Sequence, residues 1–155
     1  MRLNPDCVRS ILLYIEERFD YTDTYSSTPH IHKEMPNGDI IVDKYFENYD
    51  KQEVSYALEL LIMEGYASIA GNPTITGGNL VFARVNGLTW KGHELLNNVR
   101  NNTVWNAVKT RAAKFGGMSI SALLTGSQIL ASAMMTDPNA VQNFINGAEN
   151  IIKLF

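Results

Sequence analysis

The stretch DKQEVSYALELLIMEGYASIAGNPTITGGNLVFARV (residues 50–85) decides the fold, because an amphipathic helix in it is followed at once by a hairpin. Asp50 and Glu53 form a capping pattern ahead of an apolar stripe with helical spacing, and Gly65 ends that stripe. The stripe consists of Val54, Ala57, Leu58, Leu61 and Ile62. The pattern therefore predicts a helix over 50–64 that buries one face.

Two strand candidates, 66–70 and 80–85, follow this helix. The segment between them, 71–79, is rich in turn-forming residues, so we expect a hairpin with a long tip. Further on, Thr89 is placed to cap a helix over 88–101.

The N-terminal part begins with a helix over 5–19, because Pro5 suits the first helical position and apolar residues follow at helical spacing. Residues 20–39 are polar and aperiodic, which predicts a long exposed loop. A short apolar run at 40–42 predicts a strand, and 43–49 predicts a short helix.

The resulting order is helix, strand, helix, helix, strand, hairpin tip, strand, helix, and one more helix over 104–115 completes it. This is the order of a winged helix, in which a three-helix core is backed by a small antiparallel sheet. The sequence therefore predicts a mainly α (α+β) protein, with a winged-helix-like domain over 1–115 and additional C-terminal helices over 116–155.

Several segments of this region resemble a known family. They are RLNPDCVRSILLYIEE (2–17), ALELLIMEGY (57–66), and GLTWKGHELLNNVR followed by VWNAVK (87–109). They are similar to an uncharacterised family of small phage and prophage proteins, a domain of unknown function. The resemblance covers residues 2 to about 120, and LTWKGHE (88–94) is its most specific motif. It implies a mobile-element origin and a winged-helix-like core, and it implies no activity.

The composition is that of a globular protein with room for a real core, since 45% of the 155 residues are hydrophobic and 19% are charged. The single cysteine, Cys7, excludes an internal disulfide and favours a reducing compartment, so we expect the cytoplasm of a bacterial host. The sequence brings no nucleophile, base and oxyanion donor together, and it has no phosphate-binding glycine loop. We therefore expect a non-enzymatic protein without a cofactor.

Metal binding is also not expected. His30 and His32 alternate in the predicted loop, near Glu34 and Asp39, but a third strong ligand in register is lacking. His93 lies beside a glutamate at the start of a helix, where packing is the simpler explanation.

The charge distribution disfavours nucleic acid as a partner but does not exclude it. Residues 1–83 hold 6 basic and 13 acidic side chains, whereas residues 84–115 hold 6 basic and 1 acidic. In a winged helix the helix over 50–64 would enter the major groove, and its carboxylates would oppose contact with phosphates. If DNA is bound nevertheless, the contacts are expected from Lys51, Gln52, Ser55, Arg84 and Lys91.

Protein binding is the favoured use of the same helix. Its outward positions Tyr56, Leu60 and Met63 are residue types typical of protein interfaces. The alternative is that these three side chains pack under the 20–39 loop or against the C-terminal helices. The partner is expected to be a host or phage protein.

The C-terminal forty residues predict two apolar helices. Residues 115–136 carry no charge, but serines, threonine, glutamine and glycines interrupt them, which argues against a transmembrane span. We expect these helices to mediate self-association, with a dimer favoured, because large apolar faces are rarely left in water. The expected interface residues are Leu123, Leu124, Leu130, Met134, Val141, Phe144, Ile145, Ile151, Ile152 and Phe155. Folding back onto the domain or peripheral membrane association are the alternatives.

Overall fold

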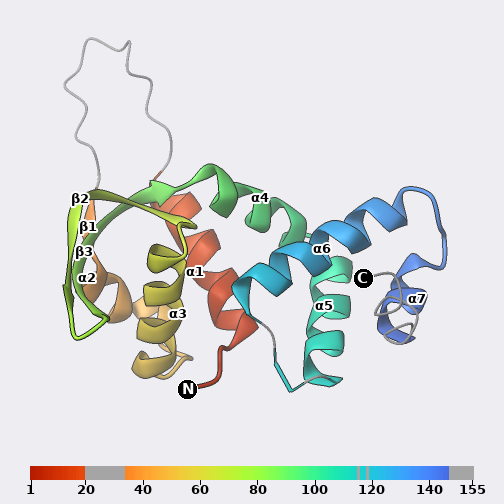
Figure 1. Ribbon diagram of the computed structural model, residues 1–155, viewed down its shortest axis with the longest axis horizontal. Helices are drawn as coiled ribbons and strands as arrows, with labels where there is room; N and C mark the ends of the chain where they lie inside the picture. The colour runs from red at the N-terminus through yellow and green to blue at the C-terminus, as the bar shows by residue number, and fades with distance from the viewer. Residues whose placement is uncertain (20–33, 115, 118, 147–155) are drawn as a thin grey trace, which may run out of the picture. The chain divides into compact units, whose positions relative to one another are not determined.

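The computed structural model describes residues 1–19, 34–114, 116–117 and 119–146. By contact density the chain divides into two compact units, Met1 with Asp6–His93 and Arg2–Pro5 with Glu94–Phe155. The chain is mostly helical, with a small three-stranded antiparallel sheet and C-terminal helices (Figure 1). The predicted α+β class is therefore confirmed.

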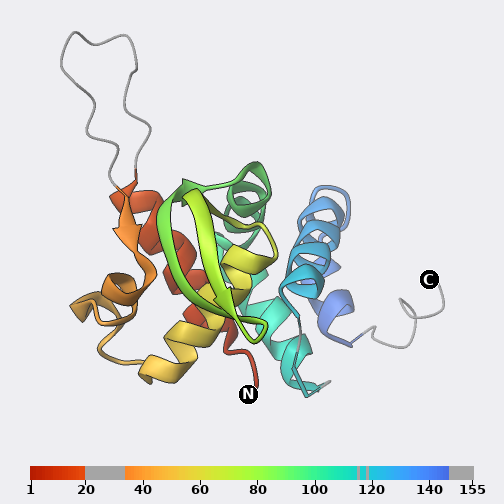
Figure 2. The same ribbon diagram turned by 60° about the vertical axis from the view of Figure 1, so that its left-hand side comes forward.

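The first unit contains three α-helices, a 3-10 helix and the sheet, and it also contains the start of α4. Its elements are α1 (Pro5–Arg18), β1 (Met35–Pro36), α2 (Asn37–Ile41), η1 (Lys44–Phe46), α3 (Lys51–Met63), β2 (Ala67–Thr76), β3 (Asn79–Leu88) and the first residues of α4 (Trp90–Val99). Helix α3 packs against both strands of the hairpin, which runs alongside it in both views (Figures 1 and 2).

The sheet has the strand order β1-β3-β2. Met35 pairs with Val85 at one edge, and Ala67 pairs with Leu88 at the other. Its inner face is apolar, since Ala83 and Val85 are buried, and it covers the helices of this unit. The core is made largely of α1 and α3 side chains, chiefly Ile11, Leu12, Ile15, Leu58 and Leu61, and Tyr66 from the turn after α3 joins them.

Two predictions for this unit were wrong. The expected strand at 40–42 is not formed, because residues 37–41 form α2, whose Ile40 is fully buried. The strand lies earlier, at Met35–Pro36, inside the segment expected to be a loop. A contact with β3 fixes the position of α2, because the buried Asn37 Oδ1 accepts a hydrogen bond from the Ala83 backbone N–H at 3.1 Å.

The hairpin tip is also shorter than predicted. Strand pairing continues to Thr76 and Asn79, so Gly77 and Gly78 alone form the turn. Their φ angles of 59° and 80° are the left-handed pair that a tight two-residue hairpin turn requires. The register shifts between Ala70 and Thr74 absorb the turn-forming residues that suggested a long tip.

The second unit is a packed set of helices. It contains the end of α4, α5 (Asn102–Lys114), α6 (Ile120–Met134) and α7 (Ala140–Asn146). Each of the last three contacts the other two. Asn101 caps α5, since its Oδ1 accepts the backbone N–H of Thr103, and the Ser119 side chain caps α6. The first of the two apolar helices predicted for the C-terminal forty residues is thus confirmed as α6, and the second is described only as far as residue 146.

Candidate functional site

The outward stripe of α3 is only partly covered. Asp50 starts the helix, because its Oδ1 accepts the Gln52 backbone N–H at 2.7 Å, as the capping pattern predicted. Tyr56 and Leu60 are half-buried, whereas Met63 is 46% exposed. The stripe is therefore a partly open apolar surface rather than a part of the core.

The outer half of the hairpin lies beside this helix. The Leu80 backbone N–H donates a hydrogen bond to Glu59 Oε1 at 3.0 Å, which fixes the hairpin against the middle of α3. Three apolar side chains of this half, Ile75, Val81 and Phe82, stay exposed. With Met63 of α3 they are the exposed large apolar side chains of this helix and of the hairpin, and this set of four residues is called the apolar surface below.

The apolar surface lies in an uncharged stretch of sequence. Residues 65–83 contain no charged side chain. Sequence reasoning missed the hairpin part of the surface, although the run of uncharged residues was a usable signal. Which hairpin side chains stay in solvent depends on the packing against α3, and that is set by tertiary structure.

Two of the three cations proposed for DNA contact are engaged within the unit. Arg84 Nη1 lies 4.0 Å from the Glu34 carboxylate, and Lys91 Nζ donates to the Glu64 carbonyl at 3.1 Å. Lys51 and Gln52 are exposed on α3, and Ser55 is half-buried.

Residues of the LTWKGHE motif (88–94) contact and stabilise the turn that follows α3. Thr89 Oγ1 lies within hydrogen-bonding distance of the Gly65 and Tyr66 carbonyls, at 2.6 and 3.1 Å. It also accepts the Gly92 backbone N–H, so it caps α4 as predicted. The Lys91 ammonium lies 4.3 Å from the centroid of the Tyr66 ring, and a Cβ at Gly92 would overlap the Tyr66 carbonyl oxygen.

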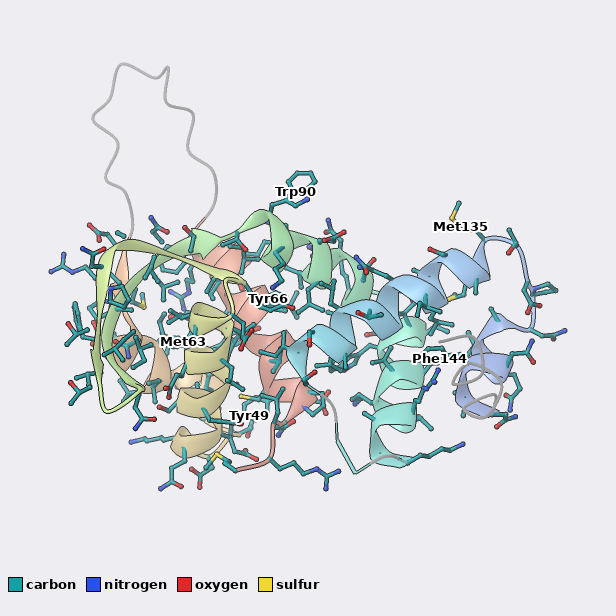
Figure 3. The ribbon with its side chains drawn as sticks, viewed as in Figure 1. Tyr49, Met63, Tyr66, Trp90, Met135 and Phe144 are labelled. Carbon is teal, nitrogen blue, oxygen red and sulfur yellow. The ribbon has the colours of Figure 1, made fainter. Side chains whose placement is uncertain are left out.

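Trp90 is the exception within this motif. Its side chain is 87% exposed and points away from the body of its unit, as Figure 3 shows. The neighbouring residues of the motif therefore serve the fold, whereas Trp90 contributes no buried surface.

A polar cluster joins α1 to the segment after α2. The Tyr14 hydroxyl donates to Asp43 Oδ2 at 2.9 Å, and Asp43 Oδ1 accepts the Tyr45 backbone N–H at 2.8 Å. The hydrogen bond from the Tyr45 amide lowers the pKa of Asp43, and the Tyr14 hydroxyl and the Arg18 guanidinium act in the same direction. Burial, followed by the Asp43 carboxylate, raises the pKa of Tyr14 to about 12.

This cluster has a structural role. The Tyr14 ring lies 5.0 Å from that of Phe46 and 5.2 Å from that of Tyr45, centroid to centroid. These contacts bind α1 to the segment after α2 and so stabilise the unit.

The cysteine and the three histidines were the remaining candidates for a reactive or metal-binding role. Cys7 is fully buried, and burial, with a smaller effect of the Glu53 carboxylate, raises its pKa to about 12. His93 is exposed, and His30 and His32 lie outside the described residues. Among the residues that the structure describes, no group of three histidine, cysteine or carboxylate side chains is placed to hold a metal ion.

The residues expected to mediate self-association differ in exposure. Leu123, Leu130 and Phe144 are buried, whereas Leu124, Val141 and Ile145 are half-buried. Met134 is 37% exposed, and its neighbour Met135, which the prediction omitted, is 87% exposed (Figure 3). Ile151, Ile152 and Phe155 lie outside the described residues.

Two cations of α5 contact α7. The Arg111 guanidinium lies 4.6 Å from the centroid of the Phe144 ring, and Lys114 Nζ donates to the Ile145 carbonyl at 3.0 Å.

Within the described part of the chain, none of the helices is long and apolar enough to cross a bilayer.

Comparison with known proteins places the chain in a family. Residues 2–119 match the family model described as "Hypothetical protein (DUF2513)". An uncharacterized protein of Haemophilus influenzae is 32% identical over 136 residues, which cover 87% of this chain and 99% of the relative. No solved structure matches significantly. The chain belongs to the DUF2513 family, whose function is unknown.

Proposed function

We propose that this protein is a non-enzymatic, winged-helix-like protein of phage or prophage type that acts by binding another protein. It works in the cytoplasm of a bacterial host, where modulation of a host or rival system is the expected role. The apolar surface carries the proposal, because Met63, Ile75, Val81 and Phe82 stay exposed on α3 and the hairpin of one unit.

The order of elements supports the winged-helix part of this proposal. A helix, a short strand, two helical segments and α3 are followed by a two-stranded hairpin, and β3 lies between β1 and β2 in the sheet. In a winged helix the hairpin is the wing, and α3 holds the place of the recognition helix.

Charge favours a protein over DNA as the partner of this surface. Residues 6–93 carry 13 acidic and 7 basic side chains, and Arg84, which lies 4.0 Å from the Glu34 carboxylate, is the one charged residue in the sequence of the wing. A surface that binds DNA gains much of its affinity from cations that replace counterions on phosphates. A wing with a single cation has little of that source of affinity, whereas exposed aromatic and aliphatic side chains suit a protein interface.

Site-specific crosslinking in the bacterial host tests the protein-binding proposal. A photoreactive phenylalanine derivative in place of Phe82 should crosslink to one discrete protein, whereas the same group in place of the exposed Asn97 should not. Val81→Glu should abolish the crosslink that forms when the photoreactive group replaces Met63. Asn48→Glu, at an exposed position outside the hairpin, is the matched control. Equal crosslinking from positions 82 and 97 would overturn the proposal.

DNA binding is tested separately by an electrophoretic mobility-shift assay over a salt series. Steep loss of binding with increasing salt would support a DNA-binding regulator, with Lys51 and Gln52 as the first contacts to mutate. The protein-binding proposal predicts no shifted complex even at low salt.

We also propose that the C-terminal helices mediate self-association. The support is the exposure of Met134 and Met135 at the end of α6, beside the half-buried Val141 and Ile145 of α7. Light scattering of the full chain should give a dimer, and the double variant Met134→Glu/Met135→Glu should give a monomer. Ser132→Glu, an exposed position of the same helix, is the control. A monomeric unaltered chain would overturn this proposal.

A further inference from the structure

We propose that Met134 and Met135, at the end of α6, form a reversible oxidation site that controls self-association. A peroxide converts their thioethers to sulfoxides, and the more polar side chains then separate two copies of the chain. This inference rests on the self-association proposed above and adds the chemistry that regulates it. The site belongs to the second unit, whereas the apolar surface belongs to the first.

The two thioethers are open to a small oxidant in the single chain. Met135 is 87% exposed and Met134 is 37% exposed. Among the other methionines, Met1 and Met63 are also exposed, and Met118 lies outside the described residues. Exposure therefore makes several methionines reactive, and only the pair at the end of α6 lies where self-association is proposed.

Two sulfur atoms of the first unit are shielded from the same reagent. Cys7 is fully buried, and burial, with a smaller effect of the Glu53 carboxylate, raises the pKa of its thiol to about 12. The thiol therefore stays protonated at neutral pH, and oxidants attack the thiolate. Met35 is half-buried, and its Sδ lies 3.3 Å from the Tyr14 hydroxyl oxygen. A peroxide is thus expected to reach the exposed methionines before the cysteine.

The oxidation step needs only the peroxide. Hydrogen peroxide transfers one oxygen atom to Sδ, so the thioether loses two electrons and the peroxide is reduced to water. The sulfoxide is a polar side chain in place of a flexible apolar one. A methionine sulfoxide reductase with a dithiol reverses the step, because the oxygen leaves as water and the dithiol is oxidised to a disulfide. The modification is therefore reversible.

Apolar contact is the source of affinity that this segment offers to a second copy. Residues 115–136 carry no charged side chain, so they can form no ion pair with another chain. A sulfoxide buried in such a contact loses its hydration without a compensating hydrogen bond, which costs free energy. The core of the unit does not pay this cost, because Leu123 and Leu130 hold the buried face of α6 while Met135 stays in solvent. Oxidation is therefore expected to separate the copies and to leave the helices intact.

Light scattering of the full chain before and after treatment with hydrogen peroxide tests the inference, with oxidised positions mapped by mass spectrometry. Oxidation of Met134 and Met135 should raise the dissociation constant of the dimer about tenfold or more. A methionine sulfoxide reductase with dithiothreitol should restore the dimer. A dimer that persists after both methionines are oxidised would overturn this inference and leave the proposed self-association standing. A monomer before any oxidation would overturn both.

The double variant Met134→Leu/Met135→Leu keeps the apolar bulk and removes both sulfur atoms. It should remain a dimer in peroxide although its other methionines are oxidised, and its dissociation there would assign the effect to another methionine and overturn the site. Met63→Leu, on the first unit, is the matched control, and it should respond to peroxide as the unaltered chain does. Circular dichroism should show unchanged helix content in the oxidised chain, since loss of helix would mean unfolding and would also overturn the inference.

Discussion

Gly92 shows how a single missing methyl group decides a packing contact. The start of α4 lies so close to the Tyr66 carbonyl that a Cβ would overlap it. We expect Gly92→Ala to destabilise the protein by about 3 kcal/mol or more, because backbone must move to relieve the overlap. Gly38→Ala is the matched control, since its Cβ would meet no atom, and it should be neutral or stabilising by up to about 1 kcal/mol. Urea titrations followed by circular dichroism compare the two, and equal stability would contradict this account.

The environment of the Tyr66 hydroxyl leads to a second prediction about a single residue. It is buried, and no hydrogen-bond partner for it exists among the described residues. A buried hydroxyl without a partner costs free energy, so Tyr66→Phe should leave the unfolding free energy unchanged or raise it by about 1 kcal/mol. Tyr14→Phe should lower it by about 1 to 2 kcal/mol, because that hydroxyl is bonded to Asp43. Thermal and urea unfolding of both variants measure the contrast, which would fail if both lost stability equally.

The same Tyr14 hydroxyl makes stability depend on alkaline pH. Its pKa is raised to about 12 in the folded chain, whereas tyrosine in an unfolded chain ionises near pH 10. The stabilising contribution is therefore fully present below pH 10 and is lost as the pH rises through 12. Unfolding midpoints from pH 8 to 12 should fall less steeply in Tyr14→Phe than in the unaltered chain. Parallel profiles would show that Tyr14 is not the responsible group.

At the scale of elements, the N-terminus of α4 depends on one side chain. Thr89 caps the helix and also contacts the carbonyls of the turn after α3. We expect Thr89→Ala to lower the unfolding free energy by about 1 to 2 kcal/mol through the loss of the cap and of these contacts. Thr110→Ala is the control, because the Thr110 hydroxyl bonds only to the Asn106 carbonyl of its own helix. Denaturant unfolding should rank Thr89→Ala as the more severe change.

Elements with local signals were predictable from the sequence, and elements set by distant contacts were not. Asp50 and Thr89 cap the helices that their positions predicted. By contrast, a loop up to residue 39 and a strand over 40–42 were expected where residues 37–41 form α2. The start of this helix is tied to Ala83 of β3, far along the chain, and sequence spacing does not show that contact. The hairpin tip was misjudged for the same reason, since pairing with β3 continues through residues that favour turns when read alone.

For the candidate surfaces the same division holds. The stripe of Tyr56, Leu60 and Met63 follows from helical spacing, and its partial exposure agrees with the outward placement expected. The run of uncharged residues was the only signal for the exposure of Val81 and Phe82, since alternating strand residues do not tell which face meets α3. Sequence spacing also does not show that the Lys91 ammonium donates a hydrogen bond to the Glu64 carbonyl within the same unit.

At the scale of the whole molecule, charge and exposure divide between the two units. The first carries an excess of acidic side chains and the apolar surface, and the second carries the basic α5 and the exposed methionines at the end of α6. The tests of the apolar surface and of self-association are therefore independent, because they address different units.

The burial of Cys7 makes the chain its own reporter of global unfolding. Its thiol is shielded and protonated at neutral pH, so a disulfide reagent such as Ellman's should leave the native protein untouched. Labelling then proceeds only through opening of the first unit, and its rate measures how often that happens. Cys7 is the single cysteine of the sequence, so a fluorophore can be attached selectively to the thiol of a Val81→Cys variant. The fluorophore then reports on the wing, while the buried Cys7 stays unlabelled.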